Sequence, residues 1–508
     1  MKVDSIKLKN FRGYHRTVEI KFDDLTVFVG KNDSGKSTVL EALDIFFNDG
    51  AGCIKFDKDD INKDAISENV NEAFITVCFS DLPSEIIIDE DHPTDLASEY
   101  MLNENGQLEI IKKYTTTGKP KVFIRALHPT NVVCKELLMK KNAELKNVAK
   151  EHSILCDDRR TNSELRKAIW EKFKNNLDCK TIEIDASKED AKKIWEKICN
   201  YLPLYSLFRV DRENSDKDEE VQDPLKIAVK QILSDSSISN RLDEIAKEVV
   251  EKLQSVSKRT LEKLKDFGET VASSLNPIIP SSKDLKWNDV FKTVSIAGDN
   301  EIPINKRGSG IKRLILISFF RAEVDRRMQE KDRKNGIIYA IEEPETSQHT
   351  YNQKILIDAL KGLSEKNNMQ IILTTHSAYI VKQLEYSNLR LIFDDNGKRN
   401  IREIKKHLLC YPSLNEVNYL AFNEISEEYH DELYSDIQEK GKITNYVDKY
   451  PEPKKIYVMR GSQEMPLSKY IRHQIHHPEN KQNQRYTQEE LRKSIEMMRD
   501  FISNYTSG

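Results

Sequence analysis

The residues Gly30-Lys31-Asn32-Asp33-Ser34-Gly35-Lys36-Ser37 match the pattern GxxxxGK[ST]. A short apolar run, Leu25–Val29, precedes them, and an apolar-periodic helix from Thr38 to Phe47 is predicted to follow. In such a strand–loop–helix context the glycines let backbone N–H groups wrap a phosphate at a helix N-terminus. The alternative, a chance glycine-rich turn, explains neither flanking element. The motif therefore predicts a phosphate-binding loop.

This loop predicts a set of nucleotide ligands. Lys36 would reach the β- and γ-phosphates of ATP, and the Ser37 hydroxyl would bind Mg²⁺. The predicted ATP-binding residues are Gly30, Asn32, Ser34, Gly35, Lys36, Ser37 and Thr38.

A second apolar run, Ile337 to Ile341, ends in two acids, Glu342 and Glu343. This is typical of a Walker B strand, whose first acid holds the Mg²⁺ shell and whose second polarises the attacking water. The usual first acid is Asp, so Glu342 is a departure that leaves the metal geometry open. The alternative is a plain strand that ends in a charged loop.

Two further segments complete the predicted site. Leu373-Thr-Thr-His376-Ser377 follows a third apolar strand, and a His there can contact the γ-phosphate, although a lone His is often structural. The segment from Lys306 to Arg313 holds Ser309 and Gly310 in a Gly/Ser loop that opens a helix, so it can bind an anion. It lies before the Walker B strand, where ABC proteins carry their signature loop.

The composition fits a cytoplasmic protein of two to four domains. The chain has 508 residues and a net charge of −4, so nucleic-acid binding would need a local basic surface such as residues 140–150, for which a solvent-exposed helix is the simpler explanation. Seven scattered cysteines without a CxxC pair argue against a zinc site or disulfide framework. No apolar run is long enough to span a membrane, and the N-terminus is predicted to be a strand, not a signal peptide.

The expected fold class is α/β, an ABC-type P-loop ATPase head with a helical insertion and an all-helical C-terminal domain. Strand signals and long charged helical stretches place the two parts of the head at 1–83 and 285–412 and a mainly helical insertion at 84–284. Residues 413–508 are expected to form a helical C-terminal domain, HEPN-like or for docking, with a short strand at Lys455–Met459.

The order Phe11-Arg12-Gly13, phosphate-binding loop, Arg307-Gly-Ser309-Gly310, Ile341-Glu-Glu-Pro-Glu345 and Thr374-Thr-His376-Ser377 resembles ATPase heads of the recombination and chromosome-maintenance class. Within that class it is most similar to the compact OLD-like ATPases of bacterial anti-phage systems, including the ATPase subunits of Septu and PARIS systems and the ATPase half of the Gabija nuclease. The likeness covers residues 1–80 and 285–400.

The resemblance implies that two heads sandwich two ATP molecules, with the signature residues Ser309, Gly310 and Arg313 acting in trans to Lys36. It thus implies a homodimer or a higher even oligomer. The glutamine expected after the first helix is missing, and Asp57, Asp59 and Asp60 stand in that neighbourhood instead.

The tail carries a separate signal. OLD proteins and the Gabija ATPase continue into a TOPRIM nuclease, which needs a Glu and a DxD after successive strands, and no such set follows residue 377. Arg472 and His477 instead form an R-x4-H pair that resembles the motif of HEPN domains, many of which are metal-independent RNases. There His477 would be the acid/base and Arg472 would hold the phosphate. An inactive HEPN-like or docking bundle, or a chance match, are the alternatives.

Three functions follow. The first is an ATP-hydrolysing sensor or regulatory subunit of an anti-phage complex that restrains or releases a partner nuclease or toxin. The second is a self-contained effector whose ATPase gates a C-terminal HEPN-like RNase. The third is a DNA-repair or chromosome-maintenance ATPase, disfavoured because no long heptad tract offers coiled-coil arms.

Overall fold

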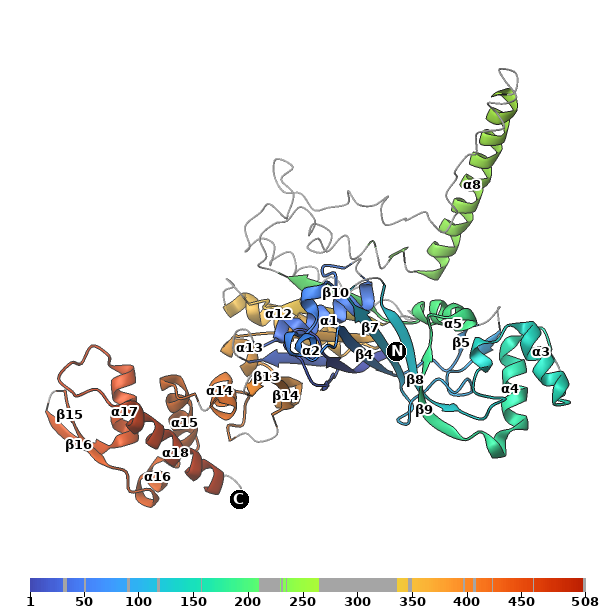
Figure 1. Cartoon of the computed structure of the whole chain (residues 1–508). Coiled ribbons are helices and arrows are strands. Elements are labelled where there is room, and N and C mark those ends of the chain that lie inside the picture. Colours follow the sequence, from blue (N-terminus) through green and yellow to red (C-terminus); the bar gives the residue numbers. More distant parts are fainter. Residues whose placement is uncertain are drawn as a thin grey trace.

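Figure 1 shows the computed structural model of the chain. It describes residues 1–30, 34–49, 52–88, 92–116, 119–156, 158–209, 229, 232–233, 235–264, 336–345, 350–395, 398–404, 408–422, 424–459 and 461–505. The predicted signature loop, with Ser309, Gly310 and Arg313, lies outside these residues, as does Asn32.

The first sheet has six strands in the order β2-β1-β4-β7-β8-β9, and every neighbouring pair is antiparallel. Apolar and polar residues alternate along β1, so one face is buried and the other meets solvent. The strands are β1 (Lys2–Lys9), β2 (Val18–Lys21), β4 (Glu72–Ser80), β7 (Leu108–Thr115), β8 (Lys121–Pro129) and β9 (Cys179–Asp185).

The second sheet has the order β10-β11-β12-β3-β13-β14 and is parallel except for the hairpin of β13 and β14. All residues of β3 and β12 are buried, as expected for central strands covered on both faces. The strands are β3 (Leu25–Val29), β10 (Leu204–Arg209), β11 (Ile337–Glu342), β12 (Met369–Thr374), β13 (Leu389–Asp395) and β14 (Lys398–Glu403).

Helix α1 (Lys36–Asn48) lies between the two sheets (Figure 1). Leu43 and Phe46 of α1 share one apolar core with Val77 of β4 and Ile338 of β11. The opposite face of the second sheet is covered by α12 (Thr350–Ser364) and α13 (Ala378–Lys382), which contribute to a second core. Helix α1 is therefore packed against both sheets.

The first sheet continues beyond residue 84, since β7 pairs with β4 and the sheet then extends through β8 and β9. The segment expected to be a mainly helical insertion therefore supplies half of one sheet, and its strand β10 forms the edge of the other. The predicted boundary at 84 does not coincide with an edge of either sheet. Its helices are α3 (Asn142–Glu151), α4 (Asn162–Lys172), α5 (Glu189–Cys199) and the protruding α8 (Ser236–Leu264).

The short elements of the N-terminal half are a 3₁₀ turn (Lys58–Asp60), α2 (Lys63–Ser67), and the two-residue strands β5 (Ile86–Ile87) and β6 (Pro93–Thr94).

The C-terminal helices gather in a unit with its own apolar core (Figure 1). It is helical apart from the hairpin of β15 (Lys454–Val458) and β16 (Ser462–Pro466), at the place where a short strand was predicted. Its helices are α14 (Leu414–Phe422), α15 (Glu427–Glu439), α16 (Ile443–Lys449), α17 (Leu467–His476) and α18 (Gln488–Tyr505).

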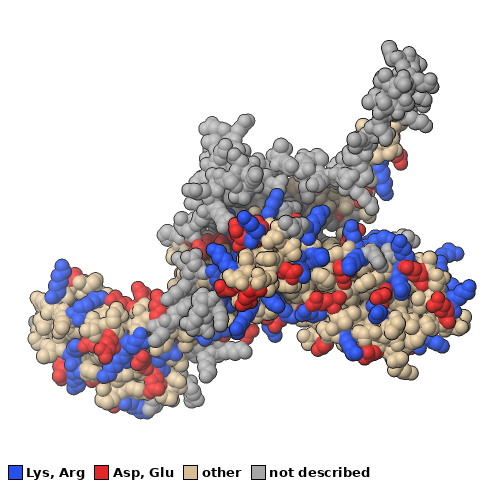
Figure 2. Space-filling model, viewed as in Figure 1, with Lys and Arg blue, Asp and Glu red and all other residues tan. Residues whose placement is uncertain are grey.

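The surface carries interspersed basic and acidic side chains over the visible face of the described residues (Figure 2). This agrees with the small net charge of −4. Among the described helices, none has the length and apolar character needed to cross a membrane.

Candidate functional site

The glycine-rich loop joins β3 to α1 with two glycines that no other residue could replace without strain. Gly35 caps α1 at φ +103°, a left-handed conformation that favours glycine. A Cβ on Gly30 would come within 2.3 Å of the Ile392 carbonyl oxygen. Both glycines therefore let the backbone before α1 pass close to β13 and β14, where a side chain would clash.

Ser34 and Lys36, next to Gly35, are both buried. The Lys36 Nζ donates a hydrogen bond to the Gly30 carbonyl at 3.0 Å, so the lysine reaches back to the end of β3. The Ser34 hydroxyl is buried and has no hydrogen-bond partner among the described residues. A buried hydroxyl without a partner costs stability unless a ligand completes it. Ser34 thus fits an oxygen-rich group such as a phosphate.

The acids at the end of β11 take different environments. Glu342 accepts a hydrogen bond from Arg209 Nε at 2.8 Å through its Oε2. Glu343 follows at φ +43°, and its backbone N–H donates to the Thr374 hydroxyl of β12 at 3.1 Å. A non-glycine residue with positive φ is uncommon and clusters at functional sites. With this backbone conformation the Glu343 carboxylate points toward the loop after β12.

His376 stands opposite Glu343, with its Nε2 2.9 Å from the Glu343 Oε1. At this distance the imidazole and the carboxylate are in direct contact. Burial lowers the His376 pKa, Lys36 lowers it further, and Glu343 opposes both. His376 therefore lies within electrostatic range of both Lys36 at the start of α1 and Glu343 at the end of β11. The neutral imidazole is favoured.

Glu345 organises the loop that carries His376, a role that was not predicted from the sequence. Its Oε1 accepts hydrogen bonds from the Thr375 hydroxyl at 2.8 Å, the His376 N–H at 2.6 Å and the Ser377 N–H at 3.1 Å. Ser377 in turn caps α13 by accepting from the Ile380 N–H. A carboxylate three positions after Glu342 was visible in the sequence, but its partners come from another strand.

A row of alternating charges runs beside the loop. Arg209 Nη2 donates to Glu41 Oε1 at 2.5 Å, Arg12 Nη1 pairs with Glu41 Oε2, and Arg12 Nε donates to Asp60 Oδ1 at 2.7 Å. With Glu342, the row links the Phe-Arg-Gly turn to the end of β11 through α1. Arg209 is the second residue that sequence reasoning missed, because β10 lies far from the motifs in the chain.

Asp57 and Asp60, which stand in place of the missing glutamine, hold a turn together. Asp57 caps the 3₁₀ turn by accepting from the Asp59 N–H at 2.7 Å. Asp60 accepts from the Asp57 N–H and from Arg12. These contacts hold the turn against the Phe-Arg-Gly segment.

Arg399 of β14 also reaches the site. A Cβ on Gly13 would meet its Nε at 2.4 Å, and a Cβ on Gly35 would meet its Nη1 at 3.0 Å. Both glycines therefore make room for this guanidinium beside the start of α1.

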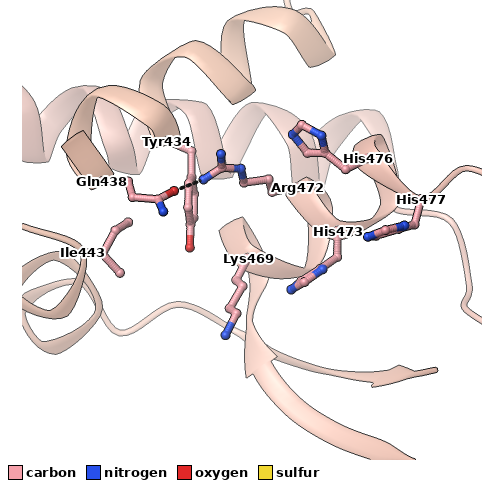
Figure 3. A pocket seen from close by; sticks show the side chains of 8 residues that line it. All are labelled: Tyr434, Gln438, Ile443, Lys469, Arg472, His473, His476 and His477. Atoms are coloured by element: carbon pink, nitrogen blue, oxygen red, sulfur yellow. Dashed lines mark hydrogen bonds between the residues drawn. The ribbon is translucent and has the colours of Figure 1, made fainter. Parts of the chain in front are cut away.

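The predicted pair Arg472 and His477 lies in the C-terminal unit, at a pocket of about 730 Å³ (Figure 3). Arg472 stacks over the Tyr434 ring at 4.5 Å and is 3.2 Å from Asp431 through its Nε, so its orientation is fixed. His477 ends α17 and contacts Glu479 at 3.1 Å. The pocket is lined by Tyr434, Gln438, Ile443, Lys469, Arg472, His473, His476 and His477.

Among the described residues that line this pocket none is acidic, and three further basic side chains, Lys469, His473 and His476, share it with the predicted pair. Burial lowers the pKa of His473, and Lys469, His477, Arg472 and His476 lower it further. The arrangement is suited to an anion. The predicted histidine and arginine open into the same pocket.

The fold and the first site define the class of protein. A phosphate-binding loop at the start of a helix held between two sheets, with acids at a neighbouring strand end, is an ABC-type P-loop ATPase head.

Comparison with known proteins agrees. The family model "AAA ATPase domain" matches residues 1–381, well over half of the chain, and the chain belongs to this family. It binds ATP and is an ATPase.

Two curated proteins are similar to this chain at about a quarter sequence identity. Endonuclease GajA of Bacillus cereus (strain HuB5-5) is 24% identical over 421 residues, which cover 76% of this chain and 56% of the relative. Endonuclease GajA of Bacillus cereus (strain VD045) is 23% identical over 401 residues, covering 77% and 58%. The chain thus spans less than two thirds of the length of either relative.

Solved structures include SMC heads. The SMC head domain from Thermotoga maritima matches with a TM-score of 0.32 and 14% identity, covering 80% of this chain and 100% of that one. An SMC head bound to the C-terminal winged-helix domain of ScpA matches with a TM-score of 0.35 and 14% identity, covering 80% and 98%. At these low TM-scores the matches add nothing to the assignment.

Proposed function

We propose that this chain is the ATP-hydrolysing sensor or regulatory subunit of an anti-phage defence complex. Its heads dimerise around Mg-ATP, and the nucleotide state controls a partner nuclease or toxin. The likeness to Endonuclease GajA over 76% of the chain supports the defence setting. The observation that carries the ATP chemistry is His376, which lies beside Glu343 and within electrostatic reach of Lys36.

In this proposal the loop binds the triphosphate. Lys36 moves its ammonium from the Gly30 carbonyl to the β- and γ-phosphates, and Ser34 donates its buried hydroxyl to a phosphate oxygen. Backbone N–H groups at the start of α1 add the helix-terminal positive potential.

Ser37 and Glu342 would hold Mg²⁺. Both supply hard oxygen ligands, and Mg²⁺ usually takes only one or two protein ligands beside phosphates and waters. When bound, the ion neutralises charge on the phosphates. Glu342 already has one carboxylate oxygen held by Arg209.

Glu343 would act as general base, its Oε1 accepting a proton from the attacking water. His376, kept neutral by burial and by Lys36, can donate one hydrogen bond to the γ-phosphate or the water without adding a full charge. Glu345 holds the loop so that the His376 imidazole stays beside the Glu343 carboxylate.

The signature residues Ser309, Gly310 and Arg313 would complete the site of a second copy, which requires a homodimer or a higher even oligomer. Mutating Glu343→Gln should trap ATP and shift the chain toward the dimer, measured by light scattering with and without Mg-ATP. A chain that stays monomeric with ATP bound would refute head dimerisation.

The defence role is tested by purifying the chain with and without its genomic neighbours and assaying RNA and DNA cleavage, with and without ATP. ATP-sensitive cleavage that requires a co-purifying neighbour would support a regulatory subunit. Cleavage by the isolated chain would contradict it and favour the second candidate.

The second candidate is a self-contained effector with a C-terminal HEPN-like RNase. The basic pocket favours it, because Arg472 is oriented by Tyr434 and Asp431 and lies with His477 in an anion-suited cavity (Figure 3). There Arg472 would hold a phosphate and His477 would move a proton.

A contact between the head and this unit supplies a route for gating. Lys382 of α13, the helix capped by Ser377, lies 3.1 Å from Glu432 of α15. Helix α15 also carries Asp431 and Tyr434, which hold Arg472. RNA cleavage that is lost in Arg472→Ala and in His477→Ala, but retained in Lys481→Ala, would establish this function.

A further inference from the structure

Arg209 is placed by strand pairing, not by a motif. It is the last residue of β10, and the parallel register sets it directly beside Glu342, the last residue of β11. Residues paired across parallel strands point to the same face. Both side chains therefore leave the sheet at its carboxyl edge, where α/β proteins bind ligands.

The guanidinium of Arg209 holds two carboxylates through two different nitrogens. Its Nε donates to Glu342 Oε2 at 2.8 Å and its Nη2 donates to Glu41 Oε1 at 2.5 Å. The Arg209 side chain is only 10% exposed. A planar guanidinium fixed at two points holds its partners in one orientation.

This contact bears on the unusual acid of the Walker B strand. Glu has one more methylene and one more rotatable bond than the usual Asp, so its carboxylate has more positions to choose from. Arg209 holds Oε2, while Oε1 makes no hydrogen bond to the described residues. One oxygen is thus anchored and the other remains available to a cation.

We propose that Arg209 is a positioning residue for Mg²⁺ binding, which orients Glu342 and compensates for the longer side chain. The inference rests on the proposed Mg-ATP site. Groups that hold a metal ligand typically contribute about 10- to 100-fold to metal affinity. Removing Arg209 is therefore expected to weaken Mg²⁺ binding, although it also removes a positive charge that repels Mg²⁺.

The experiment measures the affinity of a fluorescent ATP analogue, mant-ATP, in EDTA and across a Mg²⁺ titration. In Arg209→Met we expect the gain in affinity from Mg²⁺ to fall about tenfold or more, with the affinity in EDTA unchanged. In Glu342→Asp the shorter carboxylate no longer reaches Arg209. In the double variant Glu342→Asp/Arg209→Met, the increase in mant-ATP affinity caused by Mg²⁺ should therefore differ less than twofold from that of Glu342→Asp alone.

Arg12→Met is the matched control. Arg12 pairs with the same Glu41 through its other oxygen but does not contact Glu342. Arg12→Met should therefore resemble Arg209→Met in thermal unfolding but keep the Mg²⁺ gain of the wild type. If Arg209→Met fails to fold, Arg209→Lys is measured instead, because one ammonium group cannot bond both carboxylates as the two guanidinium nitrogens do. In Arg209→Lys the increase in mant-ATP affinity caused by Mg²⁺ should fall about threefold or more.

An unchanged or larger Mg²⁺ gain in Arg209→Met would overturn the proposal. An equal fall of the Mg²⁺-dependent affinity in Arg12→Met would also overturn it, because the fall would then come from disturbing Glu41 and the packing of α1. A wild-type chain that binds mant-ATP without any Mg²⁺ gain would instead refute the proposed Mg-ATP site, which separates the two failures.

Discussion

The Glu345 carboxylate accepts the backbone N–H of His376 at 2.6 Å, so an acid that follows β11 fixes the residue that follows β12. The same oxygen also accepts from Thr375 and Ser377. The predicted γ-phosphate contact thus depends on a residue whose own side chain is buried.

Glu345→Ala should disorder this loop, because three donors lose one shared acceptor. An unsatisfied buried donor costs about 1–3 kcal/mol, so we expect a clear loss of thermal stability and at least tenfold slower ATP hydrolysis. Glu345→Gln keeps one oxygen and should lose less of both. Hydrolysis in Glu345→Ala equal to the wild type would show that the loop needs no anchor.

Ser34→Ala separates ligand binding from folding. The hydroxyl is buried without a partner among the described residues, so its removal should leave the free protein as stable or more stable. ATP affinity should fall by about 1 kcal/mol, roughly fivefold, because a hydrogen bond to phosphate is lost. Calorimetric titration and thermal unfolding check both signs. A less stable free protein would mean that the hydroxyl has a structural partner.

Glu343→Gln should slow hydrolysis by about 10² to 10⁴, the usual contribution of a general base, and leave ATP binding intact. Phosphate release and nucleotide affinity measured on the same sample give the answer. Lys36→Ala is the contrasting variant, since it should abolish binding itself. Loss of binding in Glu343→Gln would assign that residue to the nucleotide pocket instead.

His430 makes the C-terminal unit sensitive to acid. It is fully buried, Nε2 contacts the Ser494 hydroxyl at 3.0 Å, and burial lowers its pKa to about 3. The unfolded chain takes up a proton below about pH 6.5 and the folded chain does not, so this contribution is complete above that pH and declines toward pH 3. The loss is about 2 kcal/mol at pH 5.

Hydrogen exchange of the amides in α15 and α18 would report this decline. In His430→Leu the exchange should depend less on pH between 6.5 and 5, whatever its absolute rate. An identical pH dependence in the two proteins would place the acid-sensitive group elsewhere.

The sequence predicted those parts of the fold that depend on local pattern. Periodicity predicted the strands β3, β11 and β12, and the glycine motif predicted the loop at Gly35. The residues that complete the site were not, because Arg209 and Arg399 are brought there by strand neighbours in space. Strand β9 was missed although Thr181 to Asp185 alternate polar and apolar residues, because it lies between two helices and most of its residues are exposed.

The position of β3 in its sheet has a consequence for synthesis of the chain. Its partners are β12 and β13, where Ile372 pairs with Thr26 and Leu391 with Val29. While the ribosome is still making the middle of the chain, β3 is a mostly apolar strand with both edges open, which is the kind of segment that aggregates or attracts chaperones. The nucleotide site can therefore assemble only after β12 and β13 have emerged, so ATP cannot stabilise β3 before then.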